Sequence, residues 1–287
     1  MPPHLFALLS AIGFGLANVS VKQGLAYSTP STATLISLIA HTILLWSAVL
    51  ARGAIPPVEF AAVAAITLTG LLQPVMRLCN YIGIEKVGPS RAVTLRNSFP
   101  ILSVILGVIV LGEELSALGA VGTLLVVTGI VLTTWKLEGR IINFRKRHLF
   151  FPLATAVVTA VTHPLRRYAL TVSDEPLFLT ALVGPVSLVA FIVYLASPAS
   201  KEKPLWHRKA LWPFIIGGIC ETLGIFSMLA AFSSGPVVLV SPISATTPIW
   251  TMLFAAVLFR DLERLGTSAV IGTFCVVAGV IALSFAH

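Results

Sequence analysis

Apolar stretches of about 20 residues follow one another along almost the whole chain, separated by short breaks rich in glycine, proline, serine and charge. A helix of that length spans the ~30 Å hydrocarbon core of a bilayer. Only 10% of the 287 residues are charged and the mean hydropathy is +0.97, whereas soluble domains have about 25% charged residues. In lipid, only helices and closed barrels satisfy their backbone polar groups, and no stretch alternates with the period of a barrel strand. The sequence therefore predicts an all-α integral membrane protein.

The breaks define ten predicted transmembrane helices in two sets of five. The first repeat, residues 1–139, holds helices at about 5–26, 31–51, 58–84, 90–111 and 116–135. A basic linker, residues 140–149, leads to the second repeat, residues 150–287, with helices at about 150–171, 177–197, 210–232, 236–259 and 265–285.

The chain carries an internal duplication. Residues 122–132 recur as residues 272–282, with five of eleven positions identical, and the Gly-Pro pair at 88–89 recurs at 235–236. The two matches keep the same order at offsets of 150 and 147 residues, which indicates two copies of one unit. A unit with an odd number of spans must insert its second copy upside down, so the sequence predicts two five-helix inverted repeats, an architecture typical of secondary transporters.

Lysine and arginine are distributed unequally between the two sides of the predicted bundle. The side of the N-terminus carries three of them, Arg52, Arg166 and Arg167. The opposite side carries fourteen: Lys22, Lys86, Arg91, Lys136, Arg140, Arg145, Lys146, Arg147, Lys201, Lys203, Arg208, Lys209, Arg260 and Arg264. Because short cytoplasmic loops are enriched in Lys and Arg, this count puts both termini outside the cytoplasm, in an inner (plasma) membrane. The same placement explains the pI of 9.8 without a nucleic-acid surface, so no nucleic-acid partner is expected.

The sequence shows no pattern typical of a disulfide framework, a metal site or an enzyme. The three cysteines, Cys79, Cys220 and Cys275, lie inside apolar spans with no paired spacing, so neither a disulfide framework nor a metal site is expected. Paired carboxylates, a His-x-x-Glu metal spacing and a Ser/His pair at membrane depth are not evident, which argues against an enzyme and against a bound cofactor. The N-terminus lacks the basic region of a cleavable signal peptide, so we expect the first span to be retained.

Three short motifs follow one another in the first half: Gly-Pro-Ser-Arg-Ala at 88–92, Asn-Ser-Phe-Pro at 97–100 and Leu-Gly-Glu-Glu-Leu at 111–115. A closing helix with spaced glycines comes next, and the second half repeats the pattern through Pro248 and Phe-Arg-Asp-Leu-Glu at 259–263. With these motifs the chain resembles the EamA-type branch of the drug/metabolite transporter superfamily over nearly its whole length. The second half departs from the pattern, because arginine and aspartate replace the usual Gly-Glu pair and the turn is longer.

The resemblance implies a ten-helix fold and transport activity, and says almost nothing about the substrate. Members of this family are commonly drawn with both termini inside the cell, whereas the charge count of this chain puts them outside.

Arg77 and Arg96 lie inside predicted spans, where an arginine costs about 2.5–3.5 kcal/mol at the bilayer centre on insertion scales. Either each side chain reaches up to the interface, or the two line a water-filled cavity in which a guanidinium binds a carboxylate or phosphate. Asn80, Tyr81 and Asn97 lie close to them in sequence and would supply further hydrogen bonds. In the second interpretation all five residues bind substrate.

Glu221 is the acidic residue that lies well inside a predicted span, and the repeat offset maps it onto Gln73-Pro74. It is either one partner of a structural ion pair, with Arg77 as the other, or a protonatable coupling site, because burial disfavours the charged form of a carboxylate.

Pro100 and Pro248 occupy matching mid-span positions. A proline inside a helix removes a backbone hydrogen bond and kinks it, so these two form either static kinks or hinges of a central cavity, and their matched placement favours hinges. The weaker candidates are Asn18, His41, His163 and Trp250, since a lone polar residue in a membrane helix is more often an interhelical hydrogen bond. Spaced glycines in the closing helices favour close helix contact, either as tight packing or as a dimer surface; they are Gly122, Gly129, Gly272 and Gly279.

Together these patterns predict a secondary transporter that moves a small metabolite by alternating access through a cavity lined by helices 1, 3, 4, 6, 8 and 9. Two arginines against one glutamate favour a substrate with a carboxylate, such as an amino acid, engaged first from the cytoplasm and exported. A non-transporting membrane scaffold or receptor and a membrane-embedded enzyme are the alternatives. The expected partners are the substrate and the lipid bilayer, and the protein is a monomer or a homodimer through its glycine-bearing helices.

Overall fold

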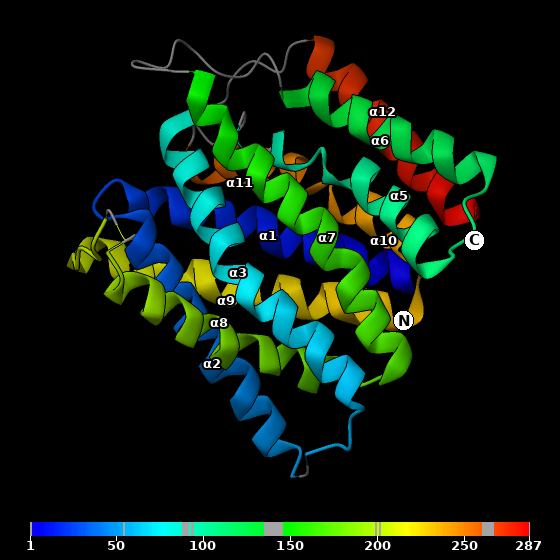
Figure 1. Cartoon of the computed structure of the whole chain (residues 1–287). Coiled ribbons are helices and arrows are strands. Elements are labelled where there is room, and N and C mark those ends of the chain that lie inside the picture. Colours follow the sequence, from blue (N-terminus) through cyan, green and yellow to red (C-terminus); the bar gives the residue numbers. More distant parts are fainter. Residues whose placement is uncertain are drawn as a thin grey trace.

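The structure is a computed structural model that describes residues 2–53, 55–87, 92, 95–134, 146–198, 200, 202–259 and 267–286. Every regular element in those ranges is helical (Figure 1). In chain order the helices are α1 (Pro3–Leu25), α2 (Pro30–Ala51), α3 (Phe60–Val87), α5 (Phe99–Leu111), α6 (Ala117–Thr134), the short 3-10 helix η1 (Lys146–Leu149), α7 (Phe150–Val172), α8 (Pro176–Ala196), α9 (Arg208–Ser234), α10 (Val237–Ser244), α11 (Thr247–Phe259) and α12 (Thr267–Phe285).

Seven helical segments of the described chain are long and apolar enough to cross a membrane, with α10 and α11 taken together as one segment. The helices α5 and α6 and the C-terminal part of α12 are shorter and equally apolar. The prediction of an all-α, multi-pass membrane protein is therefore confirmed. The predicted linker and the predicted turn at 260–264 lie largely outside the described residues.

Helix ends coincide with the residues that favour them. The α2 helix begins at Pro30, and the hydroxyl of its N-cap residue Thr29 accepts a hydrogen bond from the Thr32 backbone N–H. The α5 helix ends at Gly112, whose φ of 67° is left-handed. Glycine adopts this conformation without a side-chain clash, so the acidic turn Gly112-Glu113-Glu114 leaves the helix sharply.

Two of the predicted spans are not continuous helices. Residues 97 and 98 form a turn before α5, and Ala245 and Thr246 separate α10 from α11. The interpretation of the two matching prolines as mid-helix kinks is therefore wrong, because Pro100 and Pro248 are each the second residue of a new helix. The first turn of a helix tolerates proline, since its missing N–H would have no partner there. Matching breaks thus stand in the two halves of the chain.

Helices of the first half pack mainly against helices of the second half. The principal contacts come in matched pairs: α1 with α9 and α3 with α7, α1 with α11 and α5 with α7, α2 with α9 and α3 with α8. The α2 and α8 helices also contact each other, as do α6 and α12. The last two lie side by side at one edge of the bundle (Figure 1).

The recurring glycines are what bring α6 and α12 together. A Cβ atom added at Gly129 would lie 2.6 Å from the carbonyl oxygen of Gly272, and one added at Gly279 would lie 2.7 Å from that of Gly122. Such distances leave no room for a side chain, so backbone meets backbone as in other small-residue membrane interfaces. These glycine faces are occupied within one chain, and a dimer would have to use other surfaces.

A similar close approach joins α1 to α9 near the centre of the bundle. A Cβ at Gly13 would lie 2.9 Å from the Cys220 carbonyl oxygen and 3.0 Å from the Cα of Gly224. This contact sets Asn18 of α1 and Glu221 of α9 beside one internal space.

Candidate functional site

A small cavity lies inside the bundle, with a volume of about 50 Å³. Its walls come from α1, α3, α7 and α9, from the turn that precedes α5, and from the break between α10 and α11. These are the six regions in which the sequence analysis places the cavity. At ~10–15 Å³ for each water centre, the space holds a few waters or one very small solute in this conformation.

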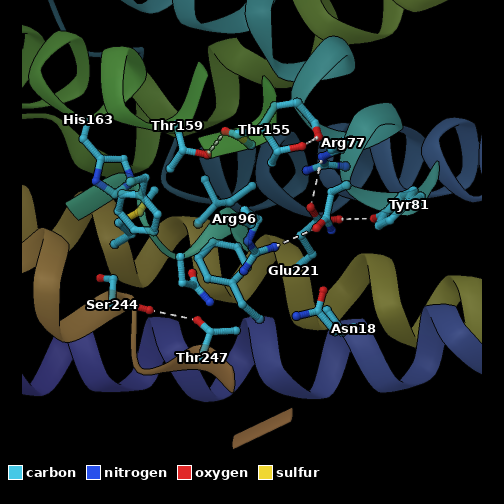
Figure 2. Close-up of a pocket in the computed structure, with 18 of the residues that line it drawn as sticks. Asn18, Arg77, Tyr81, Arg96, Thr155, Thr159, His163, Glu221, Ser244 and Thr247 are labelled. Atoms are coloured by element: carbon cyan, nitrogen blue, oxygen red, sulfur yellow. Dashed lines mark hydrogen bonds and ion pairs between the residues drawn. The ribbon is translucent and has the colours of Figure 1, made fainter. Parts of the chain in front are cut away.

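Glu221 lies at one side of the cavity in a dense polar network. Its Oε2 accepts hydrogen bonds from the Ser37 hydroxyl at 2.6 Å and the Tyr81 hydroxyl at 2.7 Å. Its Oε1 lies 3.3 Å from the Arg77 Nε, and the same guanidinium donates a short hydrogen bond to the Ser37 hydroxyl. Figure 2 shows Arg77, Tyr81 and Glu221 grouped together. The ion pair with Arg77 is thus present, and it connects α9 to α2 and α3.

Arg96 occupies the middle of the cavity in the view of Figure 2, between His163 on one side and the Glu221 network on the other. Its guanidinium donates to the Asn80 side-chain oxygen at 3.2 Å, which is a neutral partner. The next residue, Asn97, is 1% exposed, lines the cavity and has no hydrogen-bond partner at either atom of its amide. A buried, unpaired amide is costly, so Asn97 is poised to bind a polar group that enters the cavity.

Arg166 also lines the cavity, although the sequence analysis counts it among the charges at the N-terminal side. It lies in α7, is 1% exposed, and donates from Nη2 to the Gln73 side-chain oxygen at 2.8 Å, while its Nε has no partner. Its neighbour Arg167 is also helical, and donates to the carbonyl oxygens of Phe232 and Ser233. The assignment of these two arginines to a loop is therefore wrong. The signal in the sequence was Gln73, a polar residue at the depth of Glu221 that needs a hydrogen-bond partner on a neighbouring helix.

His163 lines the cavity opposite the Glu221 network. Its Nδ1 lies 2.7 Å from the Ser241 hydroxyl, and its ring meets those of Phe99 and Phe232 edge-on. A Ser/His pair at membrane depth thus exists, which the sequence did not reveal. Ser241 is fully buried and is not part of the cavity wall, so a substrate in this cavity does not reach its hydroxyl.

The remaining candidates are divided between the cavity and the packing around it. Asn18 is on the cavity wall and its amide donates to the Thr251 hydroxyl at 3.4 Å. His41 lies elsewhere, with its Nε2 3.1 Å from the Thr180 carbonyl oxygen. Trp250 packs against Gly15 and is not part of the wall.

Further polar groups and an apolar patch complete the wall, and none of these residues was predicted from the sequence as a site residue. The hydroxyl groups come from Thr155, Thr159, Ser244 and Thr247, and the apolar side chains from Phe14, Met76, Phe99, Ile225 and Met228. The Ser244 hydroxyl is buried without a partner. A solute with one polar end and a short carbon skeleton therefore matches the wall.

On the side of the N-terminus, Glu113 ties the two halves together. Its carboxylate accepts hydrogen bonds from the backbone N–H groups of Val237 at 2.8 Å and Val238 at 3.0 Å, and lies 4.0 Å from Arg167 Nε. An anion at a helix N-terminus is favourable because the helix dipole is positive there. On the opposite side, Leu205 exchanges hydrogen bonds with Thr32, and the Tyr27 and His207 rings stack at 5.4 Å. The first and second halves are thus joined at both ends of the cavity.

Fold and cavity together define a multi-pass helical membrane protein with an internal, charged binding space. Comparison with known proteins gives the family. The chain belongs to the EamA-like transporter family, whose model matches residues 1–135 and 146–285, and the resemblance seen in the sequence motifs is thereby confirmed.

A relative from Helicobacter pylori, described as an uncharacterized transporter, is 23% identical over 192 residues. The match covers 65% of this chain and 63% of the relative, so the chain spans less than two thirds of that protein. A protein known from its crystal structure is similar over 96% of this chain and 98% of its own, with a TM-score of 0.72 and 17% identity. At that identity the likeness shows the shared fold.

Proposed function

We propose that this protein is a secondary transporter that carries a small, carboxylate-bearing metabolite through the cavity. The observation that carries the proposal is the pair Arg96 and Asn97 beside the break that precedes α5. A guanidinium whose described hydrogen-bond partner is neutral and an amide without any partner line a cavity of about 50 Å³ inside an apolar bundle. Broken helices at the binding site are typical of transporters. Among the described lining residues, no serine or threonine hydroxyl is hydrogen-bonded to a histidine or a carboxylate, which supports transport over catalysis.

The proposed architecture is ten transmembrane helices in two inverted repeats. Support comes from the matched helix contacts between the halves and from the matched breaks before Pro100 and Pro248. The five spans per half predicted from the sequence would require the second copy to insert upside down. In this proposal the two prolines mark hinges at which α5 and α11 tilt, because a helix break concentrates bending at a few residues.

The proposed mechanism is alternating access. The small cavity volume and the contacts that join the halves at both ends describe a closed conformation. To admit a solute, one end must open while the other stays closed. Opening at the N-terminal side would break the Glu113 contacts with Val237 and Val238, and opening at the other side would break the Thr32–Leu205 contacts.

Glu221 is the proposed coupling site. Its carboxylate is held by partners from α2 and α3, and it loses them only if those helices separate from α9. The release of its carboxylate from these partners would therefore be linked to helix movement, which is what a coupling site requires.

Counterflow in proteoliposomes tests the proposal. Vesicles that contain the purified chain and are loaded with an unlabelled metabolite mixture should accumulate radiolabelled members of the mixture faster than vesicles without protein. No accumulation of any solute by folded protein would contradict transport and favour the scaffold or receptor alternative.

The orientation is a separate prediction. With Arg166 and Arg167 inside α7, the N-terminal side keeps only Arg52 of its three counted charges, against fourteen on the other side, so both termini should face away from the cytoplasm. A C-terminal alkaline phosphatase fusion, active only outside, should show activity, and a C-terminal fluorescent protein that folds only inside should not fluoresce. The opposite pair of results would show that the family's usual orientation applies and that cytoplasmic loading, and with it the proposed export, must be abandoned.

A further inference from the structure

The cavity has an excess of positive charge in the part of the chain that the structure describes. Three guanidinium groups line it, those of Arg77, Arg96 and Arg166, and the carboxylate among its described lining residues is that of Glu221. Three positive charges against one negative charge leave a balance of two positive charges. Arginine stays protonated in proteins, so this balance persists at physiological pH.

Glu221 is not available to a substrate. Both of its oxygens are engaged, by Ser37 and Tyr81 at Oε2 and by Arg77 at Oε1. An ammonium group entering the cavity would have to displace one of these partners to reach the carboxylate. It would also lie among three guanidinium groups, and like charges brought together at an interface cost several kcal/mol.

Of the three guanidinium groups that line the cavity, those of Arg96 and Arg166 form no ion pair with a described residue, whereas that of Arg77 pairs with Glu221. The hydrogen-bond partners of Arg96 and Arg166 are the neutral side-chain oxygens of Asn80 and Gln73. The Nε of Arg166 and both amide atoms of Asn97 are buried with no partner at all. A charge taken out of water is compensated only by an opposite charge with good hydrogen bonds. This unsatisfied set therefore calls for an anion.

We propose that the transported solute is a small organic anion without an ammonium group, bound by Arg96, Arg166 and Asn97, and that zwitterionic amino acids are excluded. The inference rests on the proposed transport function. A site that binds a carboxylate admits both zwitterionic amino acids and organic anions without an ammonium group, and the inference selects the second class. The apolar side of the wall, formed by Phe14, Ile225 and Met228, receives a short carbon chain. Small 2-hydroxy and 2-oxo acids, with one or two carboxylates, have this chemistry.

The experiment compares acids that share a carbon skeleton and differ at one group. Proteoliposomes with the full chain are assayed for counterflow of lactate, pyruvate and alanine, and of malate, oxaloacetate and aspartate, alongside the general metabolite mixture. We expect the hydroxy and oxo acids to be transported at least about tenfold faster than their amino counterparts, since ~1.4 kcal/mol of like-charge repulsion gives that ratio.

Amino acids transported as fast as their anionic counterparts would overturn the inference and leave transport intact. So would transport of members of the general mixture with none of the six acids moved. If no solute moves at all, the proposed function itself fails, and the two failures are thereby distinguished.

Substitution of Arg166 gives a second readout. Arg166→Gln removes one uncompensated charge and should lower the ratio of malate to aspartate transport about tenfold, whereas Arg166→Lys, which keeps the charge, should retain most of it. Equal ratios in wild type and Arg166→Gln would show that this charge does not select the substrate. If Arg166→Gln does not fold, the comparison of isosteric acids on the wild-type protein decides the question.

Discussion

Replacing Arg96 with alanine is expected to reduce transport by at least about 30-fold while folded protein remains in the membrane. Truncating one partner of a buried, hydrogen-bonded charge pair costs roughly 2–5 kcal/mol, and ~1.4 kcal/mol corresponds to a factor of ten. Among the described residues, Arg96 donates a hydrogen bond to a neutral partner, the Asn80 side-chain oxygen, so its loss should disturb the fold little and weaken the binding of an anion strongly. Initial rates of counterflow in proteoliposomes, normalised to the amount of reconstituted protein, measure the effect.

Two variants serve as controls for Arg96→Ala. Arg96→Lys keeps the charge and loses the planar fork of donors, so it should restore part of the rate. Arg52→Ala removes an arginine whose side chain is 55% exposed and paired with Glu175 at 2.7 Å outside the cavity, and such surface pairs contribute ~0–1 kcal/mol. It should therefore transport at the wild-type rate. Wild-type transport by Arg96→Ala would show that this arginine is structural and would return the binding site to an open question.

Replacing Glu221 with glutamine is expected to lower transport to a small residual rate and to lower the thermal stability of the purified protein. The change leaves Arg77, which is 1% exposed, without its counter-charge. Breaking a buried ion pair at one partner costs about 3–5 kcal/mol because the other charge stays buried and uncompensated. Thermal unfolding in detergent should therefore begin at a lower temperature, and the residual counterflow should no longer depend on pH.

The double variant Arg77→Gln/Glu221→Gln separates the two roles of Glu221. Removing both charges avoids the unpaired guanidinium and should recover much of the lost stability. If Glu221 couples proton movement to transport, the double variant stays inactive even though it is stable. An unchanged unfolding temperature together with a wild-type pH profile in Glu221→Gln would remove both the structural and the coupling role.

The side chains that line the cavity show which site residues can be found from the sequence alone. Arg77, Arg96 and Glu221 could be found because a charge inside an apolar span is rare and costly, whatever surrounds it. Arg166 could not, because it stands near one end of its helix, where basic residues are common. Only the packing of α7 against α3 brings it to Gln73 and the cavity. Likewise, the hydrogen bond between Ser241 and His163 joins residues 78 positions apart, and no local sequence pattern predicts it.

The sequence by itself determined the class of this protein through its hydropathy, its helix-ending residues and its internal duplication. Each of these is a pattern of neighbouring residues or of residues at a regular offset, so it does not depend on the tertiary structure. They determine an all-helical membrane protein, and the motifs around residues 88–100 and 111–115 place it in its family. The tertiary structure decided which polar groups meet. Two spans predicted to be continuous are broken at Asn97-Ser98 and Ala245-Thr246. Glu221 has three partners, whereas Arg166 Nε and the Asn97 amide have none. Charge compensation depends on distances between helices far apart in the sequence, so only the folded bundle shows which of the cavity's described charges are paired with an opposite charge.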